Sequence, residues 1–321
     1  MKTKEQVKFH QEWGFRIKEI DGINFRRQGL KLSSFPPDEH IPINQKLARK
    51  LRWRSLVTSI LMDESRKDIY DFMLATNSYA ITDFDIKPRK KINRSLKNCT
   101  FQRPSLEVLI EEGLQINRKT LERQHRKDKL LSDRKQWTRY MTSIYYRSEF
   151  NILGAFHEGR MVGMLITYEA EGKFIILMAF IDRKNSSLTQ PMSGLLFNMV
   201  NDLIKKNGAI VISYGMDQFK GKSSLNDFKR RMHFETYPAT RGYILNPLLS
   251  IPLKILVFYM IKIRKVHSPS HKWEKEVIRI FQSHRQLQAA LKREKESRKA
   301  PSSDNLYYGK GSGSETVRLS A

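Results

Sequence analysis

An almost continuous apolar run from Phe174 to Ile181 constrains the fold more than any other feature of the sequence. A strand that is apolar on both faces has to be covered on both faces, so we expect it inside a sheet with helices on each side. Two shorter strand-like runs, 150–156 and 161–168, precede it and are joined by a turn containing Gly159, which indicates a hairpin.

The residues after this run predict one more alternation of helices and strands. Apolar residues recur at helical spacing from Leu195 to Ile204, and Asn207-Gly208 ends that helix. Later elements are predicted as a strand over 209–214, a helix over 225–232 and a strand over 236–245. Hairpins followed by crossovers indicate an α/β (α+β mixed) fold, with a mixed central β-sheet flanked by helices.

The first half of the chain is less regular. Short strand-like pieces over 15–20, 23–27 and 30–32 predict a small β meander, and the apolar spacing over 45–73 is closer to that of a helix. The alternation from Tyr79 to Asp85 predicts a strand, followed by a basic helix that Pro88 opens. Two further helices are predicted, from Ser105 towards Leu121 and around Trp137.

These patterns divide the chain into four segments. We expect a small N-terminal β/α section over 1–75, an α/β domain over 76–246, C-terminal helices over 247–299 and a Ser- and Gly-rich disordered tail over 300–321. The apolar stretch 248–263 is interrupted by Pro252 and Lys254 and is shorter than a membrane-spanning helix, so no transmembrane segment is predicted.

Charge and cysteine content limit the partners and the compartment. A formal net charge of +26 on 321 residues favours a polyanionic partner, which leaves RNA, an anionic membrane surface and a nucleotide-bearing substrate open. Basic clusters at 87–103 and 118–134 fit either nucleic acid or a solvated helix face. Cys99 is the only cysteine, and the N-terminus lacks the apolar run of a secretory signal, so we expect a cytoplasmic protein. Residues 248–265, apolar with basic neighbours, fit peripheral contact with the inner face of an anionic membrane.

Two motifs, Tyr214-Gly-Met-Asp217 and Leu225-Asn-Asp-Phe-Lys-Arg-Arg-Met-His-Phe234, occur in this order of elements. With the basic helix and the tryptophan helix upstream, they resemble the FemAB-like branch of the GNAT acyltransferase superfamily. The resemblance covers roughly 79–243 and implies a GNAT-like sheet. It also suggests that the N-terminal section is a degenerate second lobe.

The resemblance implies an enzyme that transfers an acyl or aminoacyl group from an activated donor to an amine acceptor, of which a cell-envelope precursor is one candidate. Such chemistry needs fixed donors for the developing oxyanion and a proton for the leaving group. Lys229 is expected to stabilise negative charge, Phe228 to position the substrate and Tyr214 to donate a proton. The residues expected to bind the donor or substrate are Met178, Ala179, Phe180, Asp217, Arg89 and Arg94.

One departure bears on the donor. Acyl-CoA-dependent GNAT enzymes carry a glycine-rich turn before the main helix that cradles the pyrophosphate, whereas this chain has Gln190-Pro-Met-Ser-Gly194 with one glycine missing. Acyl-CoA and aminoacyl-tRNA therefore both stay open as donor substrates, and no tightly bound cofactor or metal is expected. The alternative function is that of a non-catalytic basic protein, which binds RNA or an anionic membrane surface on an inherited acyltransferase fold.

Overall fold

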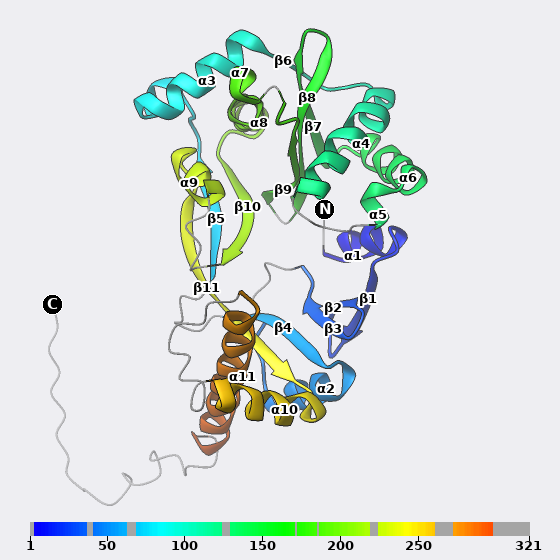
Figure 1. The fold of residues 1–321 in the computed structure, drawn as a ribbon, viewed down its shortest axis with the longest axis vertical. Coiled ribbons are helices and arrows are strands. Elements are labelled where there is room, and N and C mark those ends of the chain that lie inside the picture. Colours follow the sequence, from blue (N-terminus) through cyan, green and yellow to red (C-terminus); the bar gives the residue numbers. More distant parts are fainter. Residues whose placement is uncertain are drawn as a thin grey trace, which may run out of the picture.

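The computed structural model describes residues 3–36, 41–62, 69–123, 129–170, 172–184, 186–218, 224–260 and 272–297 (Figure 1). Its strands are β1 (Arg16–Ile20), β2 (Ile23–Gln28), β3 (Lys31–Ser34), β4 (Val57–Met62), β5 (Ile69–Thr76), β6 (Thr100–Gln102), β7 (Phe150–His157), β8 (Arg160–Ala170), β9 (Lys173–Ile181), β10 (Ile210–Gln218) and β11 (Glu235–Leu245). Its helices are α1 (Thr3–Glu12), α2 (Gln45–Arg54), the 3₁₀ turn η1 (Ile81–Asp83), α3 (Ile86–Asn98), α4 (Leu106–Arg123), α5 (Lys129–Ser132), α6 (Arg134–Tyr145), α7 (Ser186–Thr189), α8 (Pro191–Asn207), α9 (Ser224–Arg231), α10 (Pro247–Phe258) and α11 (Lys272–Ser297).

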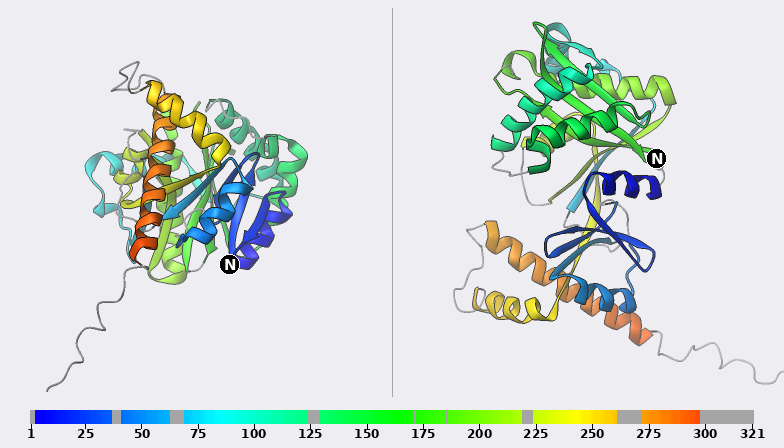
Figure 2. Two further views of the ribbon diagram at one scale, coloured as in Figure 1. Left: turned by 90° about the horizontal axis from the view of Figure 1, so that it is seen from below. Right: turned by 90° about the vertical axis from the view of Figure 1, so that its right-hand side faces the viewer.

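The described strands join into one mixed sheet in the order β1-β2-β3-β4-β11-β5-β10-β9-β8-β7-β6. β11 is the strand that holds its two halves together, because residues 235–239 pair with β5 and residues 240–245 pair with β4. The upper half in Figure 1 contains β5 to β10, and the lower half contains β1 to β4 with α2, α10 and α11. The right-hand view of Figure 2 shows the same division, with β11 running between the halves.

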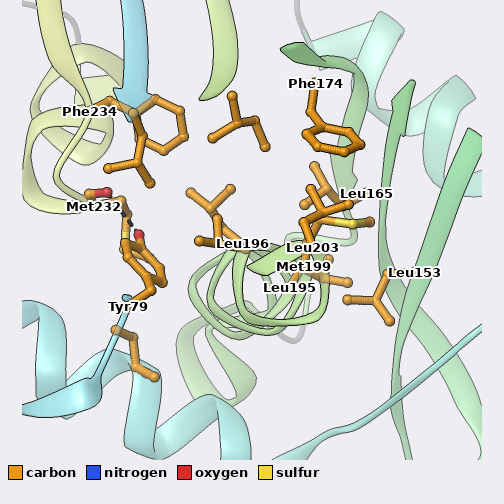
Figure 3. Close-up of a cluster of buried hydrophobic side chains, with 14 of the residues drawn as sticks. Tyr79, Leu153, Leu165, Phe174, Leu195, Leu196, Met199, Leu203, Met232 and Phe234 are labelled. Carbon is orange, nitrogen blue, oxygen red and sulfur yellow. Dashed lines mark hydrogen bonds between the residues drawn. The ribbon is translucent and has the colours of Figure 1, made fainter. Parts of the chain in front are cut away.

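In the upper half, helices cover both faces of the sheet, as the apolar run predicted. On one face, α3 and α8 pack over a core that includes Leu195, Leu203 and Phe174, and Figure 3 shows α8 lying among these side chains. On the other face, α1, α4 and α6 enclose a core that contains Trp137 and Met164. β9 therefore runs between two apolar layers, which explains why its sequence does not alternate.

The N-terminal meander is confirmed, with β1, β2 and β3 close to their predicted positions. The helical interpretation of residues 45–73 is wrong beyond α2. Ser55 ends α2 in an extended conformation (φ −154°, ψ 163°), and the β-branched residues after it, such as Val57 and Thr58, pair with β3 and β11 in β4. The predicted boundary at residue 75 falls inside β5, which pairs with β10 and β11.

The strand predicted from Tyr79 to Asp85 is also wrong, because side chains satisfy this backbone instead of a neighbouring strand. The segment contains η1, where the carboxylate of Asp83 accepts a hydrogen bond from the amide of Ala80 at 2.9 Å. The Tyr79 hydroxyl donates to the carbonyl of Met232 at 2.8 Å, the dashed line in Figure 3. The segment thereby connects β5 to α3 and packs against the residues that follow α9.

The C-terminal segment contains the two predicted helices, α10 and α11, which pack against each other and the end of β11. None of the helices in the described part of the chain is both long enough and apolar enough to cross a membrane. The predicted tail, 300–321, lies outside the described residues.

Candidate functional site

The candidate site lies where β9 and β10 separate. These strands run parallel and pair only at Phe174 with Ile212 and at Ile175 with Ser213. Beyond these pairs, β10 stays paired with β5 as far as Gln218, and β9 stays paired with β8 as far as Ile181. Among the described strands, the edge of β9 beyond Ile175 that faces away from β8 therefore has no pairing partner. Backbone amides on such an edge are available to bind a substrate carbonyl.

Both strands carry a β-bulge beside this point. On β10, Ser213 pairs with Met73 and Gly215 pairs with Phe72, so Tyr214 is the extra residue. On β9, Leu177 is the extra residue in its pairing with β8. A bulge bends a strand and redirects a side chain, so the two bulges account for the divergence.

The bulge on β10 is held by specific contacts. Gly215 has φ +82°, which glycine adopts without strain. The Gly215 amide donates to the hydroxyl of Ser213 at 3.0 Å, and that hydroxyl donates to the carboxylate of Asp71 at 3.0 Å. Ser213 is buried, and both bonds are partly buried. Together they fix the backbone on either side of Tyr214.

Lys229 reaches this bulge from α9. Its side chain is only 3% exposed, and its Nζ lies 3.4 Å from the carbonyl oxygen of Gly215. The same Nζ lies 4.4 Å from the ring centroid of Phe72 and 4.9 Å from that of Tyr214. Aromatic faces attract a cation, and the attraction is stronger where water is excluded. The structure thus places an amino group of a buried lysine beside the point where the strands diverge.

The turn after α9 holds this helix in place. His233 adopts a left-handed conformation (φ +64°), and the amide of Phe234 donates back to the carbonyl of Lys229 at 3.1 Å. This six-to-one bond is that of a Schellman motif, which ends a helix and fixes the direction of the next strand. The ring of His233 also stacks on Phe84, with centroids 4.5 Å apart. The turn between α9 and β11 and the contact with Phe84, just before α3, therefore fix the position of α9 and its Lys229.

The other catalytic residues expected from the sequence lie in the same place. The rings of Tyr214 and Phe228 meet edge to face, with centroids 6.5 Å apart, and Phe228 packs against the core beneath α8. Burial raises the pKa of Tyr214 to about 12, so its phenol stays protonated at neutral pH. Lys229, Phe228 and Tyr214 thus form one cluster.

Residues expected to bind the donor or substrate lie on three elements. Met178, Ala179 and Phe180 lie on β9 beyond its last pairing with β10. Arg89 donates to the carbonyls of Thr82 and Phe84, and Arg94 donates to the carbonyl of Ser187 at 3.3 Å. The two arginines therefore hold the start of α3 and the α7 turn. For Asp217 the structure describes only the backbone, which pairs with Tyr70 in β5.

Three residues of the cluster have no role in the sequence interpretation. Asp71 and Phe72 fell in the stretch interpreted as helical, although the spacing of Phe72 and Leu74 is that of a strand face. Ser213 was part of a predicted strand, and its hydroxyl matters only because the bulge brings the Gly215 amide to it.

The N-terminus of α8 is covered by protein. Thr189 is fully buried and Ser193 is 4% exposed, and Asn98 of α3 donates to the carbonyl of Leu188 at 3.3 Å. A Cβ on Gly194 would lie 2.3 Å from atoms of both Phe101 and Ser95, so α8 makes very close contact with α3 and β6 there. Pro191 at the first turn has no amide hydrogen. In the described part of the chain, no group of three or more His, Cys, Asp or Glu residues is arranged to hold a metal ion.

No protein-family model matches the chain, and no curated protein matches its sequence. Among solved structures, FemX aligns over 78% of this chain and 92% of its own, with a TM-score of 0.53 and 10% identity. The C-terminal domain of a protein assigned as a lysylphosphatidylglycerol synthetase from Agrobacterium fabrum aligns over 80% of this chain and 97% of its own, with a TM-score of 0.49 and 11% identity. L-PGS from Bacillus licheniformis aligns over 81% of this chain and 96% of its own, with a TM-score of 0.47 and 16% identity.

The chain has a GNAT-type fold, in which the central parallel pair, β9 and β10, separates beyond Ile175. FemX, which aligns over most of both chains, has the same fold.

Proposed function

We propose that this protein transfers an acyl or aminoacyl group from an activated donor to an amine acceptor, at the junction of β9, β10 and α9. The observation that carries the proposal is the buried amino group of Lys229, which lies 3.4 Å from the carbonyl oxygen of Gly215 on β10, two residues beyond the last pairing of β10 with β9. A FemAB-like fold supports it.

The chemistry follows from this arrangement. The nitrogen of the acceptor amine attacks the donor carbonyl, a carbon–nitrogen bond forms, and the carbonyl oxygen takes negative charge. Backbone amides of β9 and the ammonium of Lys229 stabilise that charge in a site shielded from water. The bond from carbon to the leaving oxygen then breaks, and that oxygen takes up a proton as the nitrogen loses one. Tyr214, protonated at neutral pH, supplies the proton and recovers it from the amine.

We further propose aminoacyl-tRNA, rather than acyl-CoA, as the donor. Coenzyme A binding in GNAT enzymes uses free amides at the start of the main helix, whereas in this chain Ser193 is buried there and Gly194 lies tightly against Ser95 of α3. Exposed basic side chains on α3, among them Lys87, Lys90 and Lys91, offer contacts for a phosphate backbone. The net charge of +26 favours the same partner.

The test combines binding with transfer. We expect the full chain to bind aminoacyl-tRNA with an affinity that falls steeply with salt, and to bind coenzyme A only weakly, both measured by calorimetry or filter retention. Transfer of a radiolabelled aminoacyl group to a panel of amines should fall by about 10²- to 10³-fold in Lys229→Ala. Lys205→Ala, at an exposed lysine on α8, is the matched control.

Three results would count against these assignments. Unaltered transfer by a folded Lys229→Ala variant would remove Lys229 from the mechanism. Transfer from acyl-CoA but not from aminoacyl-tRNA would show that the proposed donor is wrong. Absence of transfer from either donor class, with tRNA binding intact, would favour a binding protein on this fold.

A further inference from the structure

Helix α10 is apolar on two sides, and only one of them is covered. Leu249, Leu253 and Val257 pack towards α11, in a cluster with Phe281. The opposite side is exposed, at Leu248 (76%), Ile251 (63%), Ile255 (65%), Phe258 (59%) and Tyr259 (44%). The spacing of three or four residues puts these side chains on one stripe, which we call the α10 stripe. A surface helix of a soluble protein is polar on its outer face, so the stripe needs an explanation.

Basic and aromatic residues border the α10 stripe at its N-terminal end, and a basic residue lies within the helix. The C-terminus of α2 abuts the N-cap of α10, because the side chain of Asn246 donates to the carbonyl of Arg52 at 2.9 Å. There, Trp53 is 67% exposed and Arg54 is also exposed. Lys254 is exposed within α10 itself. In the sequence, Lys262, Arg264 and Lys265 follow the other end of the helix. An apolar stripe bordered by tryptophan and basic residues has the composition of a helix that lies in a membrane interface.

The place of α10 in the molecule suits such contact. α2 and α10 lie at the end of the lower half, away from α3, in Figure 1 and in the right-hand view of Figure 2. A flat surface can reach that end without meeting the upper half.

We propose that the α10 stripe, with Trp53, Arg54 and Lys254 around it, docks this protein on an anionic lipid bilayer. The charges distinguish this occupant from a second copy of the chain. A symmetric contact through α10 would bring the same basic residues of two chains of charge +26 together, whereas anionic headgroups neutralise them. The proposal does not depend on the transferase activity.

The experiment is co-sedimentation of the full chain with vesicles of phosphatidylcholine alone or with one third phosphatidylglycerol. We expect partitioning onto the anionic vesicles that weakens as salt rises. The double variant Ile251→Ser/Ile255→Ser should lower that partitioning by roughly tenfold or more, because two exposed isoleucines no longer enter the lipid. Leu30→Ser, at a leucine that is 63% exposed in the lower half, should leave it unchanged.

A second measurement separates charge from apolar contact. Lys254→Gln/Arg54→Gln should lower binding to anionic vesicles and leave the weak binding to neutral vesicles unchanged. No binding to anionic vesicles, or equal binding by the isoleucine variant, would overturn the proposal. A dimer seen by light scattering that dissociates in the isoleucine variant would also overturn it, because a second copy would then cover the stripe.

Discussion

The hydroxyl of Ser213 lies 3.0 Å from the amide nitrogen of Gly215 and accepts its hydrogen bond across the bulge at Tyr214. The same hydroxyl donates to Asp71 on the neighbouring strand. One small side chain thus connects β5, the bulge and the backbone against which Lys229 packs.

Replacing this residue should destabilise the protein. Ser213→Ala leaves the half-buried amide of Gly215 and the carboxylate of Asp71 without this partner, which should lower the free energy of unfolding by about 1–3 kcal/mol. Urea denaturation followed by circular dichroism measures it. Ser78→Ala, at an exposed serine, serves as the control and should change little. Equal stability of the two variants would mean that the bulge does not depend on the hydroxyl.

Two glycine-to-alanine changes on helices should act in opposite directions. At Gly194 the new methyl group would lie 2.3 Å from Phe101 and Ser95, so we expect a loss of about 1–3 kcal/mol as α8 moves away from α3. At Gly113 in α4 the nearest atoms are 3.4 Å away, and alanine favours the helix by about 0.5–1 kcal/mol. Thermal unfolding of both variants, compared with the parent chain, tests the pair. A stabilised Gly194→Ala would contradict the close contact.

Tyr214 should make stability depend on pH in the alkaline range. Its pKa is about 12 in the folded state and about 10 in the unfolded chain, so only the unfolded chain loses the proton between these values. Its contribution is fully present below pH ~10 and is lost as pH rises towards 12, at about 1.4 kcal/mol per pH unit. Tyr214→Phe should therefore lose stability less steeply over this range. Identical slopes for the two proteins would show that the phenol is not buried.

His284 should make the stability of the protein fall as pH drops, in the acid range. Its ring nitrogen lies 3.3 Å from the amide of Leu245 in the contact between α11 and β11. Burial lowers the pKa of His284 in the folded state, so below the unfolded value of about 6.5 the unfolded chain takes up the proton more readily. Stability should fall as pH drops from about 7 to 5, and His284→Gln should flatten that decline. Unfolding curves at several pH values measure the difference, and a decline that is unchanged in the variant would assign it to other groups.

The parts of the fold that the sequence predicts correctly are those with a continuous signal. The run from Phe174 to Ile181 is long and apolar on both faces, so the position of β9 and the helices around it could be inferred. β4 and β5 could not, because Val57 and Phe72 lie in short stretches whose strand identity comes from pairing with β11, a strand about 170 residues further along the chain. The segment from Tyr79 to Asp85 alternates like a strand but is fixed by side-chain hydrogen bonds.

In the candidate site, too, the sequence predicts the residues that belong to a local motif and misses those defined by strand pairing. The resemblance to a family motif predicts Phe228 and Lys229 as site residues, and the structure places both beside Tyr214. Neither bulge could be inferred, because an extra residue exists only in relation to the register of the partner strand. The roles of Ser213 and Asp71 depend on the bulge, so the sequence does not predict them either.

The single strand β11 also fixes how far the chemistry lies from the docking helix. It begins just after α9, which carries Lys229, and ends at Leu245, directly before Asn246, which caps α10. Its 11 residues span about 36 Å at the usual rise per residue of a strand. An acceptor anchored in a bilayer under α10 would have to extend its amine over a comparable height, so a long headgroup or a soluble molecule would reach Lys229 and the amine of a short phospholipid would not.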